Sequence, residues 1–255
     1  MIVGKFYSWI VVALMFAGAF EVVLNEYNII LSPGGMVEGY RPAINALPGN
    51  TDSERFSGGS GTPDDPYIIK DVWDLQNMST DLSAYYVLAS DINASATKLW
   101  NWNATAGGTG RYEGFTPVGN LTAPFTGSLD GRNHTIIGLY IDRYQSSYVG
   151  LFGYIARGGV VKDLKIITDN RSAGQIQGER FIGVLAGYSE GTIVNCHTDE
   201  KIWGGLTFYT GGLAGYNNGV VRDCSTNGSI FCNGLYVGGI VGYNNGTVIN
   251  CHLTG

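Results

Sequence analysis

The same short pattern occurs four times in the C-terminal part of the chain, and this repetition restricts the fold more than any other feature. The units are GLFGY, VLAGY, GLAGY and GIVGY, and the glycine before each tyrosine stands at position 153, 187, 215 or 242, at intervals of 34, 28 and 27 residues. A catalytic motif usually occurs once, whereas tandem units of this length indicate a repeat architecture. Short strand-like runs and Gly, Asn and Asp turns fill the intervals, so we expect coils that stack on one another.

Alignment of the units places similar side chains in columns. In a stack of coils, equivalent residues lie about 4.8 Å apart, so each column becomes a ladder. Two columns are apolar and are expected to fill the core: Leu151, Leu185, Leu213 and Ile240 in one, and Val161, Ile193, Val221 and Val248 in the other. A third column holds Asp163, Asn195, Asp223 and Asn250. Asp and Asn tolerate left-handed backbone conformations, so this column predicts a bend.

The column after the bend contains three of the four cysteines. It consists of Leu164, Cys196, Cys224 and Cys251. Leucine on the first rung indicates a buried position, because a free cysteine behaves as a small hydrophobe. In-register side chains of parallel strands point the same way, so we favour a core ladder of reduced thiols. Disulfides are the alternative in an exported protein. Cys232 lies between two units and has no place in this column.

A metal site is a second alternative, because Cys196-His197 and Cys251-His252 resemble pairs of metal ligands. Neighbouring residues in a strand face opposite sides of the sheet, so a cysteine and the adjacent histidine cannot share one ion. The middle unit also has Ser225 where the other two have histidine. We therefore expect no metal and no other cofactor.

The segment before the repeats divides into three parts. After MIVGK, 15 apolar residues end in Ala17-Gly18-Ala19, which is short for a membrane span of about 20 residues. Residues 1–19 are thus predicted to be a signal peptide, with a membrane anchor as the alternative. Residues 20–56 are rich in Gly, Pro and polar residues and are interpreted as a linker or lead-in. Residues 57–124 are expected to form the N-terminal cap and first coils, and residues 125–255 the repeats.

Within residues 57–124, the sequence predicts a strand over 67–69, a short capping helix that begins after Asp71 as its N-cap, and a further strand in AYYVLASDINAS.

Export is also supported by eight Asn-X-Ser/Thr sequons, more than chance predicts, which are candidate N-glycosylation sites. They are Asn77, Asn93, Asn103, Asn120, Asn133, Asn170, Asn227 and Asn245. The expected location is therefore extracellular or at the cell surface.

A net charge of −6 without any basic run in the sequence argues against a nucleic-acid partner.

The repeated units resemble the GLUG motif, named for its Gly-Leu-(any)-Gly core; here each unit is followed by a Gly turn and then by Asn/Asp-Cys or Asp-Leu. The upstream stretches GSGTPDDPYIIKDVWDLQNM, YYVLASDIN and PFTGSLDGRNHTIIGLYI are similar to the lead-in of such repeats, so the resemblance covers residues 57–255. It implies an all-β fold, a right-handed parallel β-helix. Members are secreted or surface-attached proteins of bacteria and archaea, including adhesin-like chains and regions that flank secreted peptidases. The motif carries no catalytic residues.

The tyrosine column is the best candidate for a binding surface. It consists of Tyr154, Tyr188, Tyr216 and Tyr243. Repeated rings could stack on sugar rings, or they could pack on each other and shield the glycine backbone. The packing of the rings on each other is the favoured interpretation.

Expected partners are cell-surface glycans or other surface proteins. An open coil at residues 237–255 would expose strand edges through which the chain could self-associate.

Enzymes also occur among β-helices, as polysaccharide lyases and hydrolases, and these need clustered carboxylates. The outward column beside the bend is Lys162, Val194, Arg222 and Ile249. It supplies no second carboxylate, and the pairs Asp64-Asp65 and Asp199-Glu200 are interpreted as solvated. We therefore predict an exported, non-enzymatic structural or adhesion module of the cell surface. The alternative is a carbohydrate-binding or carbohydrate-active β-helix.

Overall fold

The structure, a computed structural model, describes residues 23–24, 29–30, 55–108, 110–167 and 176–254. The chain divides into two compact units, Met1–Asn50 and Thr51–Gly255. In the first unit, β1 (Val23–Leu24) and β2 (Ile29–Ile30) pair antiparallel. The predicted signal peptide or anchor at residues 1–19 lies outside the described residues. Within the part that is described, no helix combines the length and the apolar character needed to cross a bilayer.

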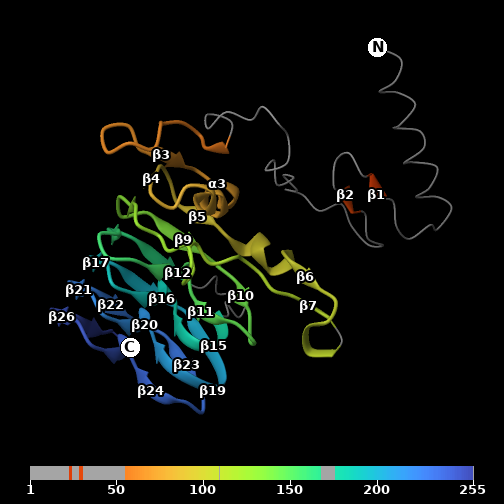
Figure 1. The fold of residues 1–255 in the computed structure, drawn as a ribbon, viewed down its shortest axis with the longest axis vertical. Helices are drawn as coiled ribbons and strands as arrows, with labels where there is room; N and C mark the ends of the chain where they lie inside the picture. Colours follow the sequence, from red (N-terminus) through yellow and green to blue (C-terminus); the bar gives the residue numbers. More distant parts are fainter. Residues whose placement is uncertain (1–22, 25–28, 31–54, 109, 168–175, 255) are drawn as a thin grey trace. The chain divides into compact units, whose positions relative to one another are not determined.

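The second unit is a parallel β-helix, as predicted. Its first sheet has the strand order β26 (Thr247–Ile249), β21 (Val220–Arg222), β17 (Thr192–Val194), β13 (Val160–Lys162), β8 (Ser128–Asp130), β4 (Tyr85–Leu88) and β3 (Tyr67–Ile69). Its second sheet has the order β27 (His252–Leu253), β22 (Ser225–Thr226), β18 (His197–Asp199), β14 (Lys165–Ile167), β9 (Thr135–Ile137) and β5 (Ile92–Asn93). The strands stack from β3 at one end of the unit to β26 at the other (Figure 1).

Two further sheets complete the coils of the repeat region. One has the order β12 (Phe152–Ile155), β16 (Ala186–Ser189), β20 (Ala214–Asn217) and β25 (Val241–Asn244). The other has the order β10 (Ile141–Asp142), β15 (Ile176–Gly183), β19 (Lys201–Gly211) and β23 (Ser229–Phe231), with β11 (Ser147–Val149) beside β15 and β24 (Leu235–Gly238) beside β19. Strand pairs such as β16–β20 and β17–β21 are parallel and in register from one coil to the next, whereas the parallel pair β15–β19 shifts its register between Gly178 and Arg180.

The N-terminal part of the second unit is less regular. The predicted strand at Tyr67–Ile69 is present as β3, and the predicted helix is α3 (Val72–Asn77). Asp71 caps it, because its carboxylate accepts hydrogen bonds from the Trp73 and Asp74 amides, both at 2.9 Å. The single-turn segments η1 (Met78–Thr80), η2 (Ser95–Leu99) and η3 (Ala106–Gly108) follow, and β6 (Trp102–Asn103) pairs antiparallel with β7 (Arg111–Tyr112). Phe56, the last residue of the predicted linker, is buried in the core.

The core of the repeat region consists of the apolar columns. Six members of the two predicted columns are 0% exposed: Leu151, Leu185, Leu213, Val161, Ile193 and Val221. The last coil differs, because Ile240 is half-buried and Val248 is 37% exposed. Val248 lies on β26, the edge strand of the first sheet, which has a neighbouring strand on one side only.

The predicted bend column is confirmed by the backbone. Asp163, Asn195, Asp223 and Asn250 have φ values of 54°, 51°, 55° and 51°. Their side chains also bond along the stack. The Asn195 amide donates to the Asp163 carboxylate at 2.6 Å, and the Asn250 amide donates to the Asp223 carboxylate at 3.2 Å. The alternation of Asp and Asn therefore provides an acceptor and a donor on neighbouring rungs.

Candidate functional site

The four predicted tyrosines form a ladder along β12, β16, β20 and β25. Tyr154, Tyr188, Tyr216 and Tyr243 pair in register across these strands. Successive ring centroids are 4.8, 4.7 and 5.0 Å apart. The first pair meets at 74°, edge to face, whereas the last two pairs are stacked with interplanar angles of 8° and 22°. We call these residues the tyrosine ladder.

A second ladder, which the sequence analysis missed, runs beside the first. It consists of Tyr148, Phe181, Tyr209 and Tyr236, and its ring centroids are 4.8, 4.9 and 5.1 Å apart with interplanar angles of 14°, 11° and 9°. A signal was present in the sequence, since each of these aromatic residues stands two positions before a glycine, at 150, 183, 211 or 238, that opens its unit or directly precedes it. We call the two ladders together the aromatic strip.

Every residue of the second ladder has a left-handed backbone. The φ values of Tyr148, Phe181, Tyr209 and Tyr236 are 64°, 52°, 60° and 59°. This conformation is uncommon for bulky side chains and costs on the order of 1–2 kcal/mol per residue. Its recurrence in four successive coils shows that the fold imposes it, and it turns each ring outward beside the tyrosine ladder.

The motif glycine explains how the chain tolerates this turn. Gly215 precedes Tyr216 and lies directly against the turned backbone of its own coil. A Cβ at this position would lie 2.5 Å from the Tyr209 carbonyl oxygen and 2.5 Å from the Ile182 nitrogen. Gly187 and Gly242 have equivalent contacts with main-chain atoms of the second ladder. Glycine is therefore required by close backbone approach, and this requirement recurs in every unit.

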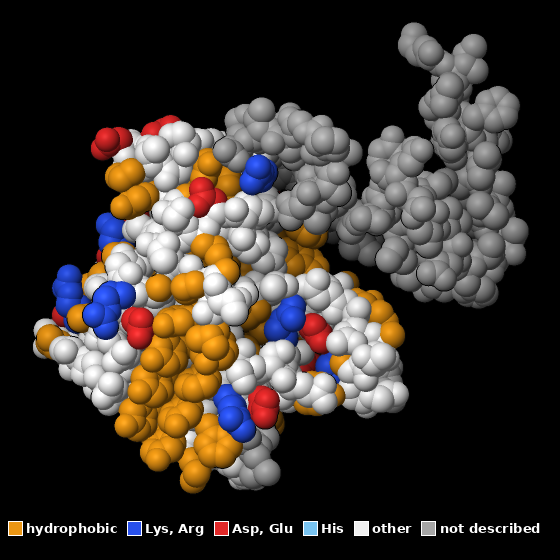
Figure 2. Space-filling model, in the orientation of Figure 1, with side chains coloured by type: hydrophobic (Ala, Val, Ile, Leu, Met, Phe, Trp, Pro, Cys, Tyr) orange, Lys and Arg blue, Asp and Glu red, His pale blue; other side chains and the backbone are white. Residues whose placement is uncertain are grey.

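The two ladders meet edge to face on three of their four rungs, whereas Tyr148 and Tyr154 on the first rung are stacked at 19° with centroids 6.4 Å apart. Phe181 lies at 71° to Tyr188, Tyr209 at 74° to Tyr216, and Tyr236 at 87° to Tyr243, with centroids 5.8, 5.6 and 5.3 Å apart. These are the favoured geometries of aromatic pairs. Figure 2 shows a continuous band of hydrophobic side chains on the face where Figure 1 places β11, β15, β16, β19, β20 and β24. The strip is half-buried for most of its length, and Tyr236 is 52% exposed.

Ring stacking limits what the tyrosine ladder can bind. Two rings lying flat side by side could not bring their centroids within 4.7 Å, so Tyr188 and Tyr216 overlap face to face. Tyr216 is stacked on Tyr188 on one side and on Tyr243 on the other, so both of its faces are covered. A sugar ring needs an uncovered aromatic face. The glycan-stacking role predicted for all four tyrosines therefore has room only at the end rungs.

Hydroxyl groups at the edge of the strip are electrostatically perturbed. Burial, together with the adjacent Glu190 carboxylate, raises the pKa of Tyr154 to about 12. Burial is also the main cause that raises the pKa of Tyr188 and of Tyr216. Glu190 is held in place by the Asn218 amide, which donates to it at 3.1 Å, and Asn245 donates to Asn218 in turn at 2.9 Å.

The cysteine column lies where the sequence placed it. Cys196 and Cys224 are 2% and 0% exposed, Cys251 is half-buried, and all four thiols, Cys232 included, are free. The backbone amide of Cys196 donates to the Cys224 sulfur at 3.4 Å. Burial raises the pKa of Cys196 and so disfavours its thiolate. The adjacent His197 faces the other way and bonds through Nδ1 with the Ser225 hydroxyl at 2.8 Å.

Charged residues beside the bend pair with each other. Lys162 lies 2.8 Å from Asp130 and 3.7 Å from Asp163, and Arg222 lies 2.8 Å from Asp223. Burial is the largest single effect on Asp130 and opposes its ionisation, but the hydrogen bonds from Lys162 and the Arg132 amide, together with the positive charges of both residues, lower the pKa of that carboxyl. Within the described ranges, no group of three or more His, Cys, Asp or Glu side chains is placed to hold a metal ion.

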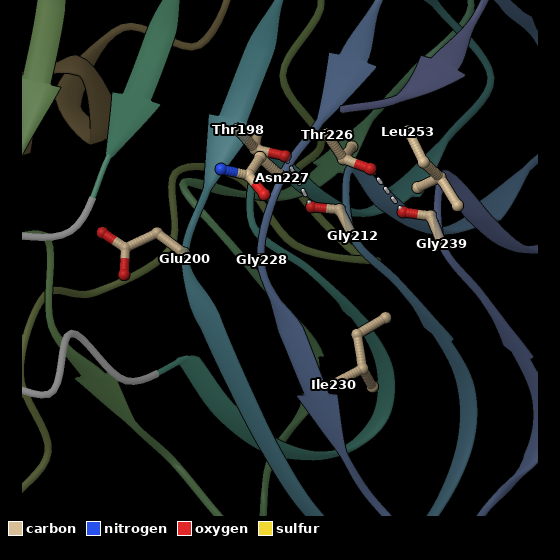
Figure 3. Close-up of a pocket in the computed structure, with 9 residues that line it drawn as sticks. All are labelled: Thr198, Glu200, Gly212, Thr226, Asn227, Gly228, Ile230, Gly239 and Leu253. Carbon is tan, nitrogen blue, oxygen red and sulfur yellow. Dashed lines mark hydrogen bonds between the residues drawn. The ribbon is translucent and has the colours of Figure 1, made fainter. Parts of the chain in front are cut away.

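A small pocket lies at the corner between β18 and β19. Its volume is about 150 Å³, and it is lined by Thr198, Glu200, Gly212, Thr226, Asn227, Gly228, Ile230, Gly239 and Leu253 (Figure 3). The Thr198 and Thr226 hydroxyls donate to the carbonyls of Gly212 and Gly239 at 2.9 and 2.8 Å. Ligand pockets usually start at about 300 Å³, so this one is small for an organic ligand.

Glu200 corrects the interpretation of Asp199-Glu200 as a solvated pair, because Glu200 is 3% exposed. Strand alternation is the reason. Residues 198, 200 and 202 are buried while 199 and 201 face outward, since β18 continues almost directly into β19. The interpretation of the pair as solvated did not take the period of two along a strand into account.

The sequons occupy different environments. Asn93, Asn120 and Asn133 are exposed, and the Asn93 and Asn120 side-chain oxygens accept hydrogen bonds from the hydroxyls of Ser95 and Thr122. The amides of the others donate within the protein: Asn77 to Arg55, Asn103 to Glu113, Asn227 to Asp199 and Asn245 to Asn218. Asn170 lies outside the described residues. Glycosylation stays a prediction.

These features define a β-solenoid built from GLUG repeats. Residues 233–255 match the family model described as the GLUG motif, which confirms the resemblance seen in the sequence. The chain is therefore a GLUG-repeat protein with a parallel β-helix fold.

Two relatives extend this similarity. The chain is 40% identical over 152 residues to halomucin of Haloquadratum walsbyi, across 57% of this chain and 2% of halomucin. It is 32% identical over 150 residues to a protein of Evansella cellulosilytica described as a Gly-rich membrane protein, across 58% of this chain and 16% of that protein. The chain thus matches only a small part of either relative.

Among solved structures, a Bacteroides ovatus protein described as an immunoglobulin A1 protease aligns over 78% of this chain and 70% of its own, with 19% identity and a TM-score of 0.49. This likeness is too low to support a statement about activity.

Proposed function

We propose that the chain is a non-enzymatic structural and adhesion module of an exported cell-surface protein. The observation that carries this proposal is that side chains on the outer surface of the solenoid repeat from coil to coil and contact one another. The aromatic strip and the Asp/Asn bend column lie outside the core, yet they repeat in register as the core does, and their side chains bond to their own neighbours in the stack. Charged groups at the bend pair with opposite charges nearby instead of converging as an acid and a base.

The surface location is supported by the relatives. One is named halomucin and the other is described as a membrane protein, although each shares only a segment with this chain. Labelling of intact cells with a membrane-impermeant biotin reagent tests this location. The chain should be labelled in intact cells, with a cytoplasmic protein of the same cells as the unlabelled control. Labelling only after lysis would contradict the proposal.

The adhesive face is proposed to include exposed apolar side chains of β19, β23 and β24, which belong to one sheet and include Tyr236 of the aromatic strip. Trp203, Phe231, Leu235 and Tyr236 are 40%, 46%, 60% and 52% exposed, and Trp203 stacks on Phe231 at 4.6 Å. Apolar side chains gathered on a surface are typical of sites that contact other proteins. Beads coated with the chain should bind cells, and Leu235→Ser should weaken this binding. Leu121→Ser removes an equally exposed leucine, at 59%, from the loop between Val118 and Phe125, which pair with β12 at the opposite end of its sheet from β25, and should leave binding unchanged.

Carbohydrate binding is the second candidate, supported by the end of the tyrosine ladder. Tyr243 is stacked on one side by Tyr216 and lies on β25, the edge strand of its sheet, whereas Tyr216 is covered on both faces. A glycan array should then show binding that Tyr243→Ala abolishes and Tyr216→Phe retains. Equal loss with both variants would point to a structural effect.

Self-association through residues 237–255 also stays a proposal. Val237, Val248, Ile249 and Leu253 in this segment are exposed apolar residues. Sedimentation across a concentration series should show association, and a single monomeric species at high concentration would contradict it.

A further inference from the structure

The aromatic strip places phenol rings of successive coils in contact. Tyr188 and Tyr216 have centroids 4.7 Å apart, Tyr216 and Tyr243 are 5.0 Å apart, and in the second ladder Tyr209 and Tyr236 are 5.1 Å apart. The strand register fixes these neighbours, because the paired residues stand opposite each other in parallel strands. The rings are half-buried or exposed, so their edges are open to an oxidant in solution.

We propose that the aromatic strip is a modification site at which a one-electron oxidant, such as a peroxidase acting with hydrogen peroxide, joins tyrosines of neighbouring coils as dityrosine. Each of two phenols loses one electron and its hydroxyl proton. The two phenoxyl radicals combine through one ortho carbon of each ring, adjacent to the carbon that bears the oxygen, and a carbon–carbon bond forms. The hydrogen on each of these carbons then moves to the oxygen of its ring. The two electrons and two protons released reduce one peroxide molecule to two water molecules.

Proximity is what makes this site selective. Radical coupling between two tyrosines requires their rings to meet, and a fixed register keeps the same two rings together in every molecule. Tyr216 has three tyrosine neighbours, since Tyr209 lies 5.6 Å away in addition to Tyr188 and Tyr243. An exposed tyrosine such as Tyr112 instead has Trp102 as its ring neighbour, at 4.9 Å.

The chain contains its own control. Phe181 occupies the second rung of the second ladder and has no hydroxyl group to oxidise. It separates Tyr148 from Tyr209, with centroids 4.8 and 4.9 Å from them. Dityrosine can therefore form in that ladder only between Tyr209 and Tyr236.

A cross-link would join neighbouring coils covalently, so the oxidised chain should melt at a higher temperature than the untreated chain.

The test treats the full chain at low concentration with peroxidase and hydrogen peroxide, then measures dityrosine fluorescence and identifies the linked peptides by mass spectrometry. We expect the links between stacked rings, 188–216, 216–243 and 209–236, in preference to the edge-to-face pairs 154–188 and 209–216. Tyr216→Phe keeps the stacked ring but should eliminate both links to position 216. Tyr112→Phe removes one exposed tyrosine outside the strip and should leave the links unchanged. Phe181→Tyr should add a link from position 181 to 148 or 209.

Three results would overturn the proposal: covalent dimers in place of links within one chain, links spread over Tyr85 and Tyr112 as readily as over the strip, or an unchanged link pattern in Tyr216→Phe. Thermal melting of each untreated variant checks that it folds. The proposal depends on ring geometry alone, so its failure would leave the surface-labelling result untouched.

Discussion

The buried aromatic side chains lie in the N-terminal coils and the first repeat unit, whereas the aromatic side chains of the later units lie outside the core. Phe56, Tyr67, Tyr86, Phe125 and Phe152 are all buried and connect through ring contacts, from 4.3 Å between Phe56 and Tyr67 to 6.4 Å between Tyr86 and Phe125. The change occurs within one column, because Phe152 is followed in register by Ala186, Ala214 and Val241.

This difference shows two ways to build a coil. An irregular interior accommodates large rings because each is packed by different neighbours. A repeated interior is filled by small and medium side chains, Leu, Val, Ile, Ala and Cys, which stack on copies of themselves. The large rings of the repeat coils then occupy the outer face, where stacking at strand spacing is itself favourable.

The largest effect is expected from a charge in the repeated interior. Cys224→Asp places a carboxylate at a position that is 0% exposed, and an uncompensated buried charge costs about 3–5 kcal/mol. Cys224→Val nearly conserves volume and polarity, so its cost should stay below about 1.5 kcal/mol. Thermal melting of the two variants checks this. Equal stability would mean that the cysteine column is open to solvent.

Removal of one ring from each region tests the comparison directly. Phe125→Ala empties a fully buried site and should cost about 3–5 kcal/mol of unfolding free energy. Tyr236→Ala removes a ring that is 52% exposed and stacks on Tyr209, so it should cost only about 1 kcal/mol. Denaturant unfolding of both variants measures the difference. If the two costs were alike, the aromatic strip would contribute as much to folding as the interior does.

The sequence predicted the columns well because repetition makes each position visible four times. Leu151 with its equivalents, and Asp163 with its equivalents, could be placed inside and at the bend from residue type alone. The second ladder was missed because its aromatic residues stand at left-handed positions, where residue preferences favour Gly, Asn or Asp over Tyr. The buried cluster of Phe56, Tyr67 and Tyr86 was also beyond reach, since it joins residues that share no repeat.

The glycine of the motif should be intolerant of any side chain. Gly215→Ala would place a Cβ 2.5 Å from main-chain atoms. Because this backbone is rigid and cannot move away, the substitution should lower the free energy of unfolding by about 3 kcal/mol. Gly108 is the matched control. Its φ is 78° and a Cβ there would meet nothing within 4 Å, so Gly108→Ala should cost about 1 kcal/mol for conformation alone. Chemical denaturation compares the two, and similar costs would show that close approach is not what the motif glycine provides.

The smallest expected effect concerns the outer edge of the strip, where Tyr154 lies beside Glu190. Burial and the Glu190 carboxylate raise the pKa of Tyr154 from 10.0 to about 12, so the folded chain holds this proton to a higher pH than the unfolded chain does. The resulting stability is fully present below pH 10 and is lost as the pH rises through about 12.

Glu190→Gln keeps the shape of the side chain, but it removes the negative charge. The pKa of Tyr154 should therefore fall towards 10.0 while staying above it, because burial is the larger cause. Phenolate absorbance of the variant, subtracted from that of the unaltered chain across this pH range, measures the shift. Glu179→Gln removes a carboxylate that faces Arg180 and should leave the titration unchanged. Identical curves for Glu190→Gln and the unaltered chain would show that burial alone perturbs Tyr154, and that the edge of the aromatic strip is governed by packing as the interior is.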